Sequence, residues 1–466
     1  MKKRVYIVHS IDTEGPLNES LASTFERLEE LFGIKNLPRT RDTLAKLQAR
    51  EIDLGKELTA KIAEALSGHR LRINGTWTEV LAMLDRIMDN RFRQKMPDSQ
   101  GNGWVYNWHC LDLVGYENNP RRRDLGYHNI FDRYVEVMGE YPDCPDGLHF
   151  HFHPMSIYRD AHRCATSYIN SPELWQIICR KILERNWFPS VFRAGFQAER
   201  PDSHWILEQW IPFDCSNMAT DTPEELELSV DFRKGRSGDW RRAPADWSVY
   251  YPAHDDYQTP GNCRRAISRS LNVMSRTASI DQREVDKAFA RAASGKPTIM
   301  GLCSHDFRDI GIEVDHVRDM IAKAAEKYPE VEFEYAEALY AFRQVLDLDM
   351  SQPALDFSIK LHSKPENDVP YLEIRTHAGK TFGPPPFLAL ETRARRFIHD
   401  NLDFGNEPGV WYYAFHGDTL PLDDVRRIGV ASNDALGNTC IRTIDVSSSK
   451  NFQGKETTHS GGSAFR

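Results

Sequence analysis

Four short apolar runs that end in polar, reactive side chains constrain the fold of this chain more than any other feature. The runs lie in residues 5–14, 147–154, 191–196 and 297–306, and each has the residue types of a buried strand. The segments between them carry apolar residues at helical spacing. Strands that alternate with helices form an α/β fold, which binds ligands at the carboxyl ends of its strands. We therefore expect the four reactive ends to form one rim of an active site.

Three histidines stand at every second position in the second run: His149, His151 and His153. In a strand, residues i, i+2 and i+4 share a face, whereas in a helical turn only i and i+4 do so. His149 and His153 therefore converge in either structure, and His151 joins them only if the segment is extended. Because imidazole is a frequent metal ligand near neutral pH, the pattern predicts a metal site. The alternative is an amphipathic strand with buried phenylalanines and solvent-facing histidines.

The other runs supply the groups that a hydrolytic metal site requires. Asp12 and Glu14 follow the first apolar stretch and precede a Gly-Pro turn, Arg193 lies in the third run, and His305 lies near the end of the fourth. A metal-dependent hydrolase needs a carboxylate ligand, a base and an acid for the leaving group. For the two carboxylates, the alternative role is that of a helix cap or turn residue.

The order of these groups resembles that of the polysaccharide deacetylases of carbohydrate esterase family four, which remove N- or O-acetyl groups from glycans. Residues 10–16 are similar to the family's first motif, Thr-Phe-Asp-Asp-Gly-Pro, with one residue inserted and the second acid changed to Glu. Residues 147–154 match the second motif, His-Ser/Thr-x-x-His, with His149 and His153 as its histidines and Phe150 in place of the small hydroxyl residue.

The remaining motifs follow in the family's order. Arg193 matches the arginine of the third motif, with Phe196 nearby in place of the usual Pro-Tyr. Asp246 and Trp247 are similar to the Asp-Trp end of the fourth motif, and His305 resembles the histidine of the fifth.

The resemblance extends over about residues 3–346. It implies a distorted (β/α) barrel of seven or eight strands that holds a catalytic divalent metal, zinc in the first place, with cobalt, nickel or manganese as alternatives. The implied ligands are Glu14, His149 and His153, with Asp12 and His151 as alternates. We expect His149→Ala or His153→Ala to lose both bound metal and activity.

The resemblance also implies roles for the groups around the metal. Asp12 would take the proton of the attacking water, although the reverse assignment of Asp12 and Glu14 stays open. Arg193 would keep that carboxylate ionised, and His305 would protonate the leaving group. A backbone N–H near Phe196 would stabilise the oxyanion. The implied substrate-binding residues are Phe196, Trp108, Asp246 and Trp247.

Trp108 belongs to an aromatic-rich segment over residues 104–112 that reads as a strand. Trp104, Tyr106 and Trp108 alternate onto one face of that strand. Packing in the core is one explanation of this face. The other is a substrate groove in which sugar rings stack on Trp104 or Trp108.

The composition restricts the partners and the compartment. A formal net charge of −9 disfavours nucleic-acid phosphates as the main partner. The basic run 121–123 is typical of a solvated helix start, with a phosphate contact as the alternative. No run approaches the ~20 apolar residues of a membrane span, and residues 5–8 are shorter than the ~7–15 apolar residues of a signal peptide. Since the eight cysteines form no Cys-x-x-Cys pair, we expect a reducing, cytoplasmic location.

A chain of 466 residues is longer than a domain with a single hydrophobic core ordinarily is, so two or more domains are expected. Residues 1–349 are expected to form the barrel domain, with a helical insertion over about 19–140. Alternating apolar residues predict a small β-rich, sandwich-like domain over 353–446. That domain is either a carbohydrate-binding module or a packing appendage that supports a homodimer. Residues 447–466 are expected to be a disordered tail.

These observations predict a metal-dependent deacetylase that acts on a carbohydrate. The expected substrate is a nucleotide sugar or a lipid-linked glycan of surface-polysaccharide biosynthesis, because the cytoplasm offers these. One alternative is a catalytically inactive carbohydrate-binding scaffold with the same fold. A second alternative is a metal-dependent hydrolase of small amides.

Overall fold

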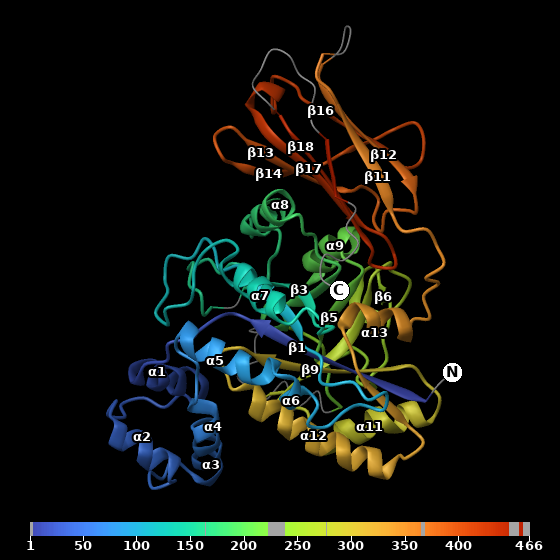
Figure 1. Ribbon diagram of the computed structural model, residues 1–466. Helices are drawn as coiled ribbons and strands as arrows, with labels where there is room; N and C mark the ends of the chain where they lie inside the picture. The colour runs from blue at the N-terminus through green and yellow to red at the C-terminus, as the bar shows by residue number, and fades with distance from the viewer. Residues whose placement is uncertain are drawn as a thin grey trace.

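The computed structural model describes residues 3–163, 165–221, 238–275, 277–364, 369–446 and 456–459. Within this part of the chain, seven parallel strands close into a barrel (Figure 1). In spatial order they are β1 (Arg4–Thr13), β2 (Asn107–Leu111), β3 (Gly147–Phe152), β4 (Val191–Ala194), β5 (Phe213–Asn217), β8 (Ala266–Asn272) and β9 (Thr298–His305). Pairing of β1 with β9, from Val5↔Thr298 to Asp12↔His305, closes the barrel. The expected α/β barrel is confirmed at this level.

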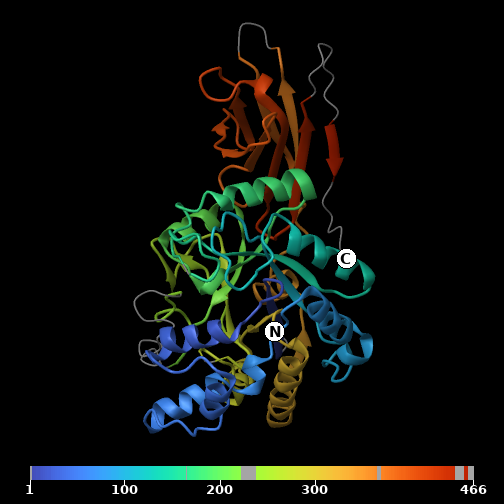
Figure 2. The same cartoon turned by 90° about the vertical axis from the view of Figure 1, so that its left-hand side faces the viewer.

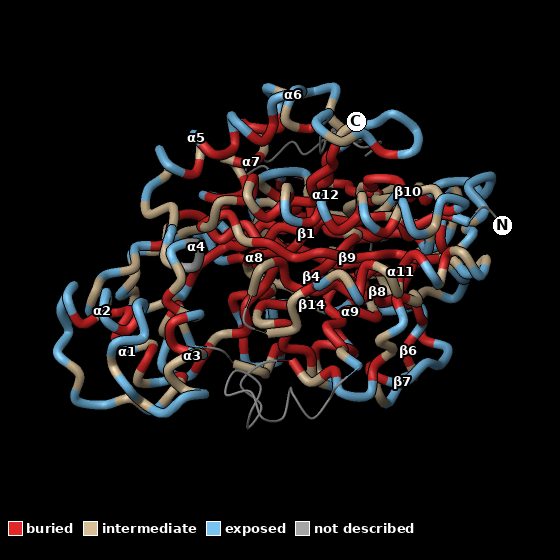
Figure 3. Tube along the Cα trace, turned by 90° about the horizontal axis from the view of Figure 1, so that it is seen from below, coloured by how far each residue is buried: buried red, intermediate tan, exposed pale blue. Residues whose placement is uncertain are grey.

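Helices cover the outside of the barrel, so its strands are buried on both faces (Figure 3). This double burial explains why the strands read as apolar runs rather than as a simple alternation. The main helices here are α5 (Trp77–Met88), α7 (Asn129–Glu140), α8 (Glu173–Arg185), α9 (Pro201–Trp210), α11 (Gln282–Ala293), α12 (Ile310–Lys327) and α13 (Ala338–Val345). Short elements complete this domain: α6 (Asn90–Arg93), the 3₁₀ helix η1 (Gly195–Gln197), β10 (Glu332–Tyr335) on the edge of β1, and the hairpin β6 (Pro252–Ala253) and β7 (Asp256–Pro260).

A small helical subdomain follows β1 in the chain. It consists of α1 (Leu21–Phe32), α2 (Arg41–Gln48), α3 (Lys56–Ala65) and α4 (Gly68–Leu71). Its own apolar core gathers Phe25, Leu28, Leu47, Ile62 and Leu66. Because β2 is a barrel strand and α7 packs beside it, the inserted helical segment is shorter than the expected span of 19–140.

Two antiparallel sheets form the C-terminal part of the chain, as the alternating pattern predicts. One sheet has the order β11 (Asp356–His362), β12 (Tyr371–Ala378), β16 (Val410–Ala414), β15 (Asp403–Phe404). The other has the order β14 (Phe397–Asp400), β13 (Phe387–Thr392), β17 (Val425–Asn433), β18 (Thr439–Asp445), β19 (Glu456–His459), and the 3₁₀ helix η3 (Leu422–Asp424) precedes β17. One apolar core contains side chains of both sheets. The expected tail at 447–466 is structured where β19 pairs with β18, and its other residues lie outside the described ones.

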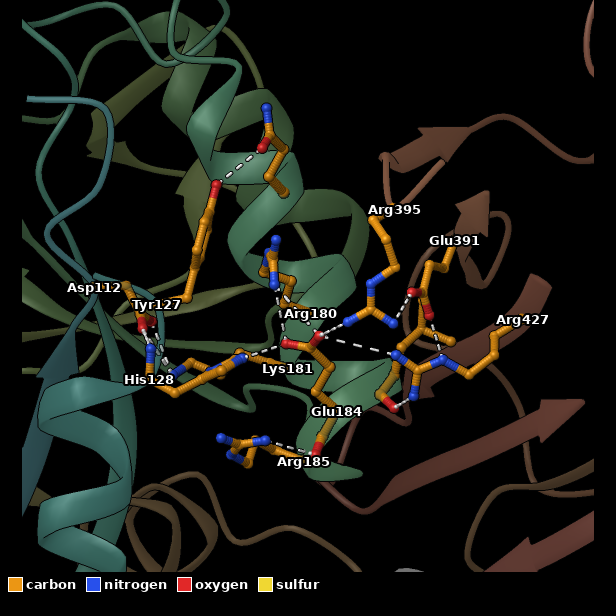
Figure 4. Close-up of polar contacts among 12 residues, drawn as sticks. Asp112, Tyr127, His128, Arg180, Lys181, Glu184, Arg185, Glu391, Arg395 and Arg427 are labelled. Carbon is orange, nitrogen blue, oxygen red and sulfur yellow. Dashed lines mark hydrogen bonds and ion pairs between the residues drawn. The ribbon is translucent and has the colours of Figure 1, made fainter. Parts of the chain in front are cut away.

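The C-terminal sheets sit at one end of the molecule on α8 (Figures 1 and 2). Phe387 and Phe397 pack into the apolar cluster that includes Ile178 and Ile182 of α8. A polar network continues this contact: Glu184 of α8 lies 3.9 Å from both Arg395 and Arg427, which also pair with Glu391 (Figure 4). Among the helices described, none combines the length and hydropathy that a bilayer span requires.

Candidate functional site

The four reactive ends expected from the sequence meet at the carboxyl ends of neighbouring barrel strands. Asp12 and His305 are directly paired positions of β1 and β9, and His151 and Arg193 are paired positions of β3 and β4. Parallel strands bring their carboxyl ends to one rim, where barrel enzymes place their sites. The residues therefore come together although long segments of sequence separate them.

Glu14, His151 and His153 form the candidate metal site. One donor atom of each residue lies within 4.8 Å of the others, and all three side chains are buried. Nε2 of His153 lies 3.0 Å from Nε2 of His151 and 3.5 Å from Oε1 of Glu14. Two imidazoles and one carboxylate are the protein ligand set of many catalytic zinc sites. The side chains present therefore fit a divalent transition metal.

The tautomer of His151 supports this assignment. Its Nδ1 lies 2.9 Å from the carbonyl oxygen of Arg193, which can only accept a hydrogen bond. Nδ1 therefore carries the proton, and the lone pair of Nε2 is left for a metal. Such a hydrogen bond to the second ring nitrogen is the usual support of a ligating histidine.

His149, expected as a ligand, is not part of this cluster, and the alternate His151 takes its place. Nε2 of His149 lies 3.1 Å from Oδ1 of Asn107 and 3.2 Å from Oε1 of Glu337. All three histidines do share one face of the extended segment, but each residue advances a strand by ~3.3 Å. His149 therefore lies one layer deeper in the barrel than His151. The histidines of the candidate metal site are therefore the i, i+2 pair at the strand end, His151 and His153, and not the i, i+4 pair.

Asp12 is held in place by Arg193. Nε of Arg193 donates to Oδ1 of Asp12 at 2.7 Å, and Nη1 donates to the carbonyl oxygen of Cys215 at 2.6 Å. His305 lies on the other side, with Nε2 3.7 Å from Oδ2 of Asp12. Burial acts to raise the pKa of Asp12, but the neighbouring charge of Arg193 above all opposes it, and the pKa is held below its usual range. The carboxylate is therefore ionised at neutral pH.

Glu14 divides its two oxygens between different partners. Oε2 pairs with Nη1 of Arg123 at 2.6 Å, whereas Oε1 faces His153 and lies 3.8 Å from Nε2 of His305. Burial would raise the pKa of Glu14, yet Arg123 and His153 outweigh it and hold the pKa well below its usual range. These contacts favour Glu14 as the metal ligand and Asp12 as the base, which is the assignment that the resemblance implies.

Two positioning residues, Asp306 and Arg123, were not expected from the sequence. The carboxylate of Asp306 accepts hydrogen bonds from the backbone N–H groups of Glu14 and Gly15 at 3.0 and 2.9 Å and from the hydroxyl of Tyr134 at 2.9 Å. It therefore anchors the loop that carries Glu14. Burial raises the pKa of Asp306 to about 7, although these three hydrogen bonds act in the opposite direction. In the sequence, the position of Asp306 directly after His305 was the feature that could have indicated this role.

The basic run 121–123 is not a solvated helix start. Arg123 is 8% exposed and pairs with Glu14, and Nε of Arg121 lies 3.4 Å from Oε2 of the buried Glu19. Arg121 and Arg123 line the cavity and contribute structural cations to the site, whereas Arg122 is exposed to solvent.

A cavity of about 1320 Å³ opens over these residues. Asp12, Glu14, His153 and His305 form part of its wall. Phe196 also lines the cavity, as expected, with its ring centroid 4.8 Å from that of His153. Its φ of +54° is left-handed, which a bulky residue adopts only where the surroundings enforce it. The rim carries the exposed apolar side chains of Ile157 and Tyr158.

The other residues expected to bind substrate lie elsewhere. Trp108 is fully buried and packs between Tyr106 and Tyr134. Trp247 is also fully buried and donates from Nε1 to the carbonyl oxygen of Glu284. Both tryptophans belong to the same buried apolar cluster, so packing in the core is their role.

Asp246 is at the protein surface, where it pairs with Nη1 of Arg291 at 2.5 Å. It does not line the cavity. The Asp-Trp pair that is similar to the fourth motif therefore has a structural role. Comparison of the sequence with family models and with curated proteins finds no match.

Proposed function

We propose that this protein is a metal-dependent hydrolase that removes an acyl group, in the first place acetyl, from a carbohydrate. The observation that carries the proposal is the convergence of Glu14, His151 and His153 with the Asp12–Arg193 pair and His305. Asp12, Glu14, His153 and His305 line one cavity, and His151 and Arg193 are buried directly behind them. The resemblance of the motif order to the polysaccharide deacetylases points to the same chemistry.

Glu14, His151 and His153 would hold the metal, with zinc as the first candidate. When bound, the ion would supply Lewis acidity to a water molecule and to the acyl oxygen of the substrate. The three ligands leave positions open for these groups, as catalytic zinc sites require.

The chain's own residues supply the proton transfers. Asp12, kept ionised by Arg193, accepts the proton of the attacking water. The proton that Asp12 accepts passes to His305, whose Nε2 lies 3.7 Å from Oδ2 of Asp12, and from His305 to the departing nitrogen or oxygen. Burial lowers the pKa of His305, opposed by Asp12 and Glu14, so the ring is neutral before it receives that proton. A backbone N–H at the left-handed turn of Phe196 stabilises the oxyanion.

The cavity favours a substrate larger than a simple amide. Its volume of about 1320 Å³ exceeds the ~300–1,000 Å³ of pockets that bind small ligands. Tyr158 at the rim is 58% exposed and offers an aromatic face on which a sugar ring can stack. An acetylated oligosaccharide or nucleotide sugar suits these dimensions.

The test is acetate release by the zinc- or cobalt-loaded protein from acetylated nucleotide sugars, N-acetylated and O-acetylated oligosaccharides, and small amides. Asp12→Asn is expected to lower kcat by about 10²–10⁴-fold. Asp246→Asn is the matched control, because the same carboxylate-to-amide change is made outside the cavity, and it should retain activity. Metal binding without acetate release from any of these compounds would indicate a catalytically inactive carbohydrate-binding scaffold. Acetate release from small amides alone would indicate a metal-dependent hydrolase of small amides.

A further inference from the structure

A second cluster of metal-ligating side chains lies outside the cavity. His204 and Glu208 stand one helical turn apart on α9, His254 follows β6, and Cys263 precedes β8. His204, Glu208 and Cys263 are buried, and one donor atom of each lies within 4.8 Å of the others. None of the four lines the cavity of the candidate active site.

The distances within this cluster suit a tetrahedral ion. Sγ of Cys263 lies 3.9 Å from Nδ1 of His254, and Nδ1 of His254 lies 2.8 Å from Oε2 of Glu208. In a tetrahedral zinc site, bonds of ~2.3 Å to sulfur and ~2.0–2.1 Å to nitrogen place these two ligand atoms about 3.5 Å apart. Small side-chain adjustments therefore bring all three donors to one ion. His254, with a side chain 67% exposed, leaves the site open to entry from solvent.

His204 is placed to donate a hydrogen bond to the sulfur of Cys263 rather than to bind the ion itself. Nε of Arg265 donates to Nδ1 of His204 at 3.0 Å, so the proton of the neutral ring is on Nε2. Nε2 lies 3.0 Å from the carbonyl oxygen of Ala253 and 3.6 Å from Sγ of Cys263, and it can donate to both. A donor of this kind orients a metal ligand without replacing it.

We propose that Cys263, Glu208 and His254 bind a second divalent transition metal, of the zinc class, with His204 as the hydrogen-bond donor that positions the sulfur. The thiolate and carboxylate balance the charge of the ion, and sulfur with nitrogen selects zinc or cobalt over magnesium or calcium. The site ties α9, the β6–β7 hairpin and the start of β8 together. Because none of its residues lines the cavity, the site is independent of the reaction proposed above.

Cobalt spectroscopy tests this site without any activity measurement. The full-length protein loaded with Co²⁺ should show the near-ultraviolet charge-transfer band of a thiolate–cobalt bond, with two ions per chain. Cys263→Ser should abolish the band and leave one ion per chain. His153→Ala, which alters only the cavity site, and Cys303→Ser, which removes a thiol 3.6 Å from Oδ2 of Asp12, should both retain the band.

His254→Gln keeps the test decisive if Cys263→Ser does not fold, because His254 is largely exposed. Added zinc should raise the Tm of His153→Ala, since an ion that binds only the folded state stabilises it. The same addition should leave the Tm of the His153→Ala, His254→Gln double variant unchanged. A wild-type protein without the band, or a band that persists in Cys263→Ser, would overturn the proposal.

Discussion

Nε of Arg193 lies 2.7 Å from Oδ1 of Asp12, although the two residues are 181 positions apart in the chain. Both side chains are buried, and the guanidinium also donates to the carbonyl oxygen of Cys215. A buried carboxylate without such a partner would favour its protonated form. The pair therefore explains how a carboxylate inside the barrel can remain a proton acceptor.

Replacement of Arg193 should change the pH dependence of the reaction. Because the charge of Arg193 opposes the effect of burial on the pKa of Asp12, Arg193→Met should raise that pKa and move the acid limb of kcat/KM to higher pH. We expect kcat/KM at neutral pH to fall by about 10²–10⁴-fold. Arg193→Lys keeps the charge and should shift the limb less. A pH profile of Arg193→Met that overlays the wild-type profile would contradict the role given to this pair.

Metal retention should distinguish His151 from His149. In a Cys263→Ser background, which removes the second candidate site, His151→Ala and His153→Ala should lose zinc on dialysis. Loss of an outer-shell residue already costs about 10–100-fold in affinity, so loss of a direct ligand should cost more. His149→Ala should keep its zinc, because His149 contacts Asn107 and Glu337 instead. Zinc loss in His149→Ala, with its fold intact by circular dichroism, would restore His149 as a ligand.

The buried ion pair of Lys181 with Asp112 should contribute more to the free energy of unfolding than the exposed ion pair of Arg185 on the same helix. Nζ of Lys181 lies 2.8 Å from Oδ2 of Asp112, and each side chain is 1% exposed (Figure 4). Lys181→Met leaves a buried carboxylate without its cation, which typically costs about 3–5 kcal/mol. Arg185→Met on the same helix removes an ion pair that is 34% and 41% exposed, and should cost at most about 1 kcal/mol. Urea unfolding measures both, and equal losses would refute the distinction.

Glu313 on α12 should make stability depend on pH. Burial raises its pKa from 4.5 to about 7, opposed by a hydrogen bond with Ser304. A group with a raised pKa in the folded state contributes stability below pH 4.5, and this contribution is lost as the pH rises through about 7. Glu313→Gln should therefore be more stable relative to wild type at pH 8 than at pH 5, by up to about 3 kcal/mol, since one pKa unit corresponds to about 1.4 kcal/mol. Identical differences at both pH values would show that Glu313 does not titrate in this range.

Several features of the fold and site could be predicted because they depend on local patterns. Apolar runs that alternate with segments of helical spacing predicted an α/β fold, and the resemblance to the polysaccharide deacetylases implied that its strands form a barrel. A change to alternating apolar residues predicted the C-terminal sheets. Turn and strand signals placed Asp12, Glu14, Arg193 and His305 at strand ends, where the structure has them.

Other features could not be predicted because strand periodicity identifies a face but not a depth or a neighbour. His149 and His151 share a face of β3, and only the barrel shows that His149 lies one layer deeper. Trp108 and Trp247 were candidate sugar-binding aromatics, yet both are buried. Helices cover the outer face of β2, which carries Trp108, and Trp247 packs into the same apolar cluster from the segment before β6.

The sequence by itself determined which residue types stand at the ends of which strands, since that information is contained in short-range spacing and composition. The tertiary structure alone decided which of them meet: the pairing of β1 with β9 placed Asp306 under the Glu14 loop, and the segment after β2 brought Arg123 to the same glutamate. The physical reason is that barrel closure sets distances between residues hundreds of positions apart. No local preference of the chain encodes those distances.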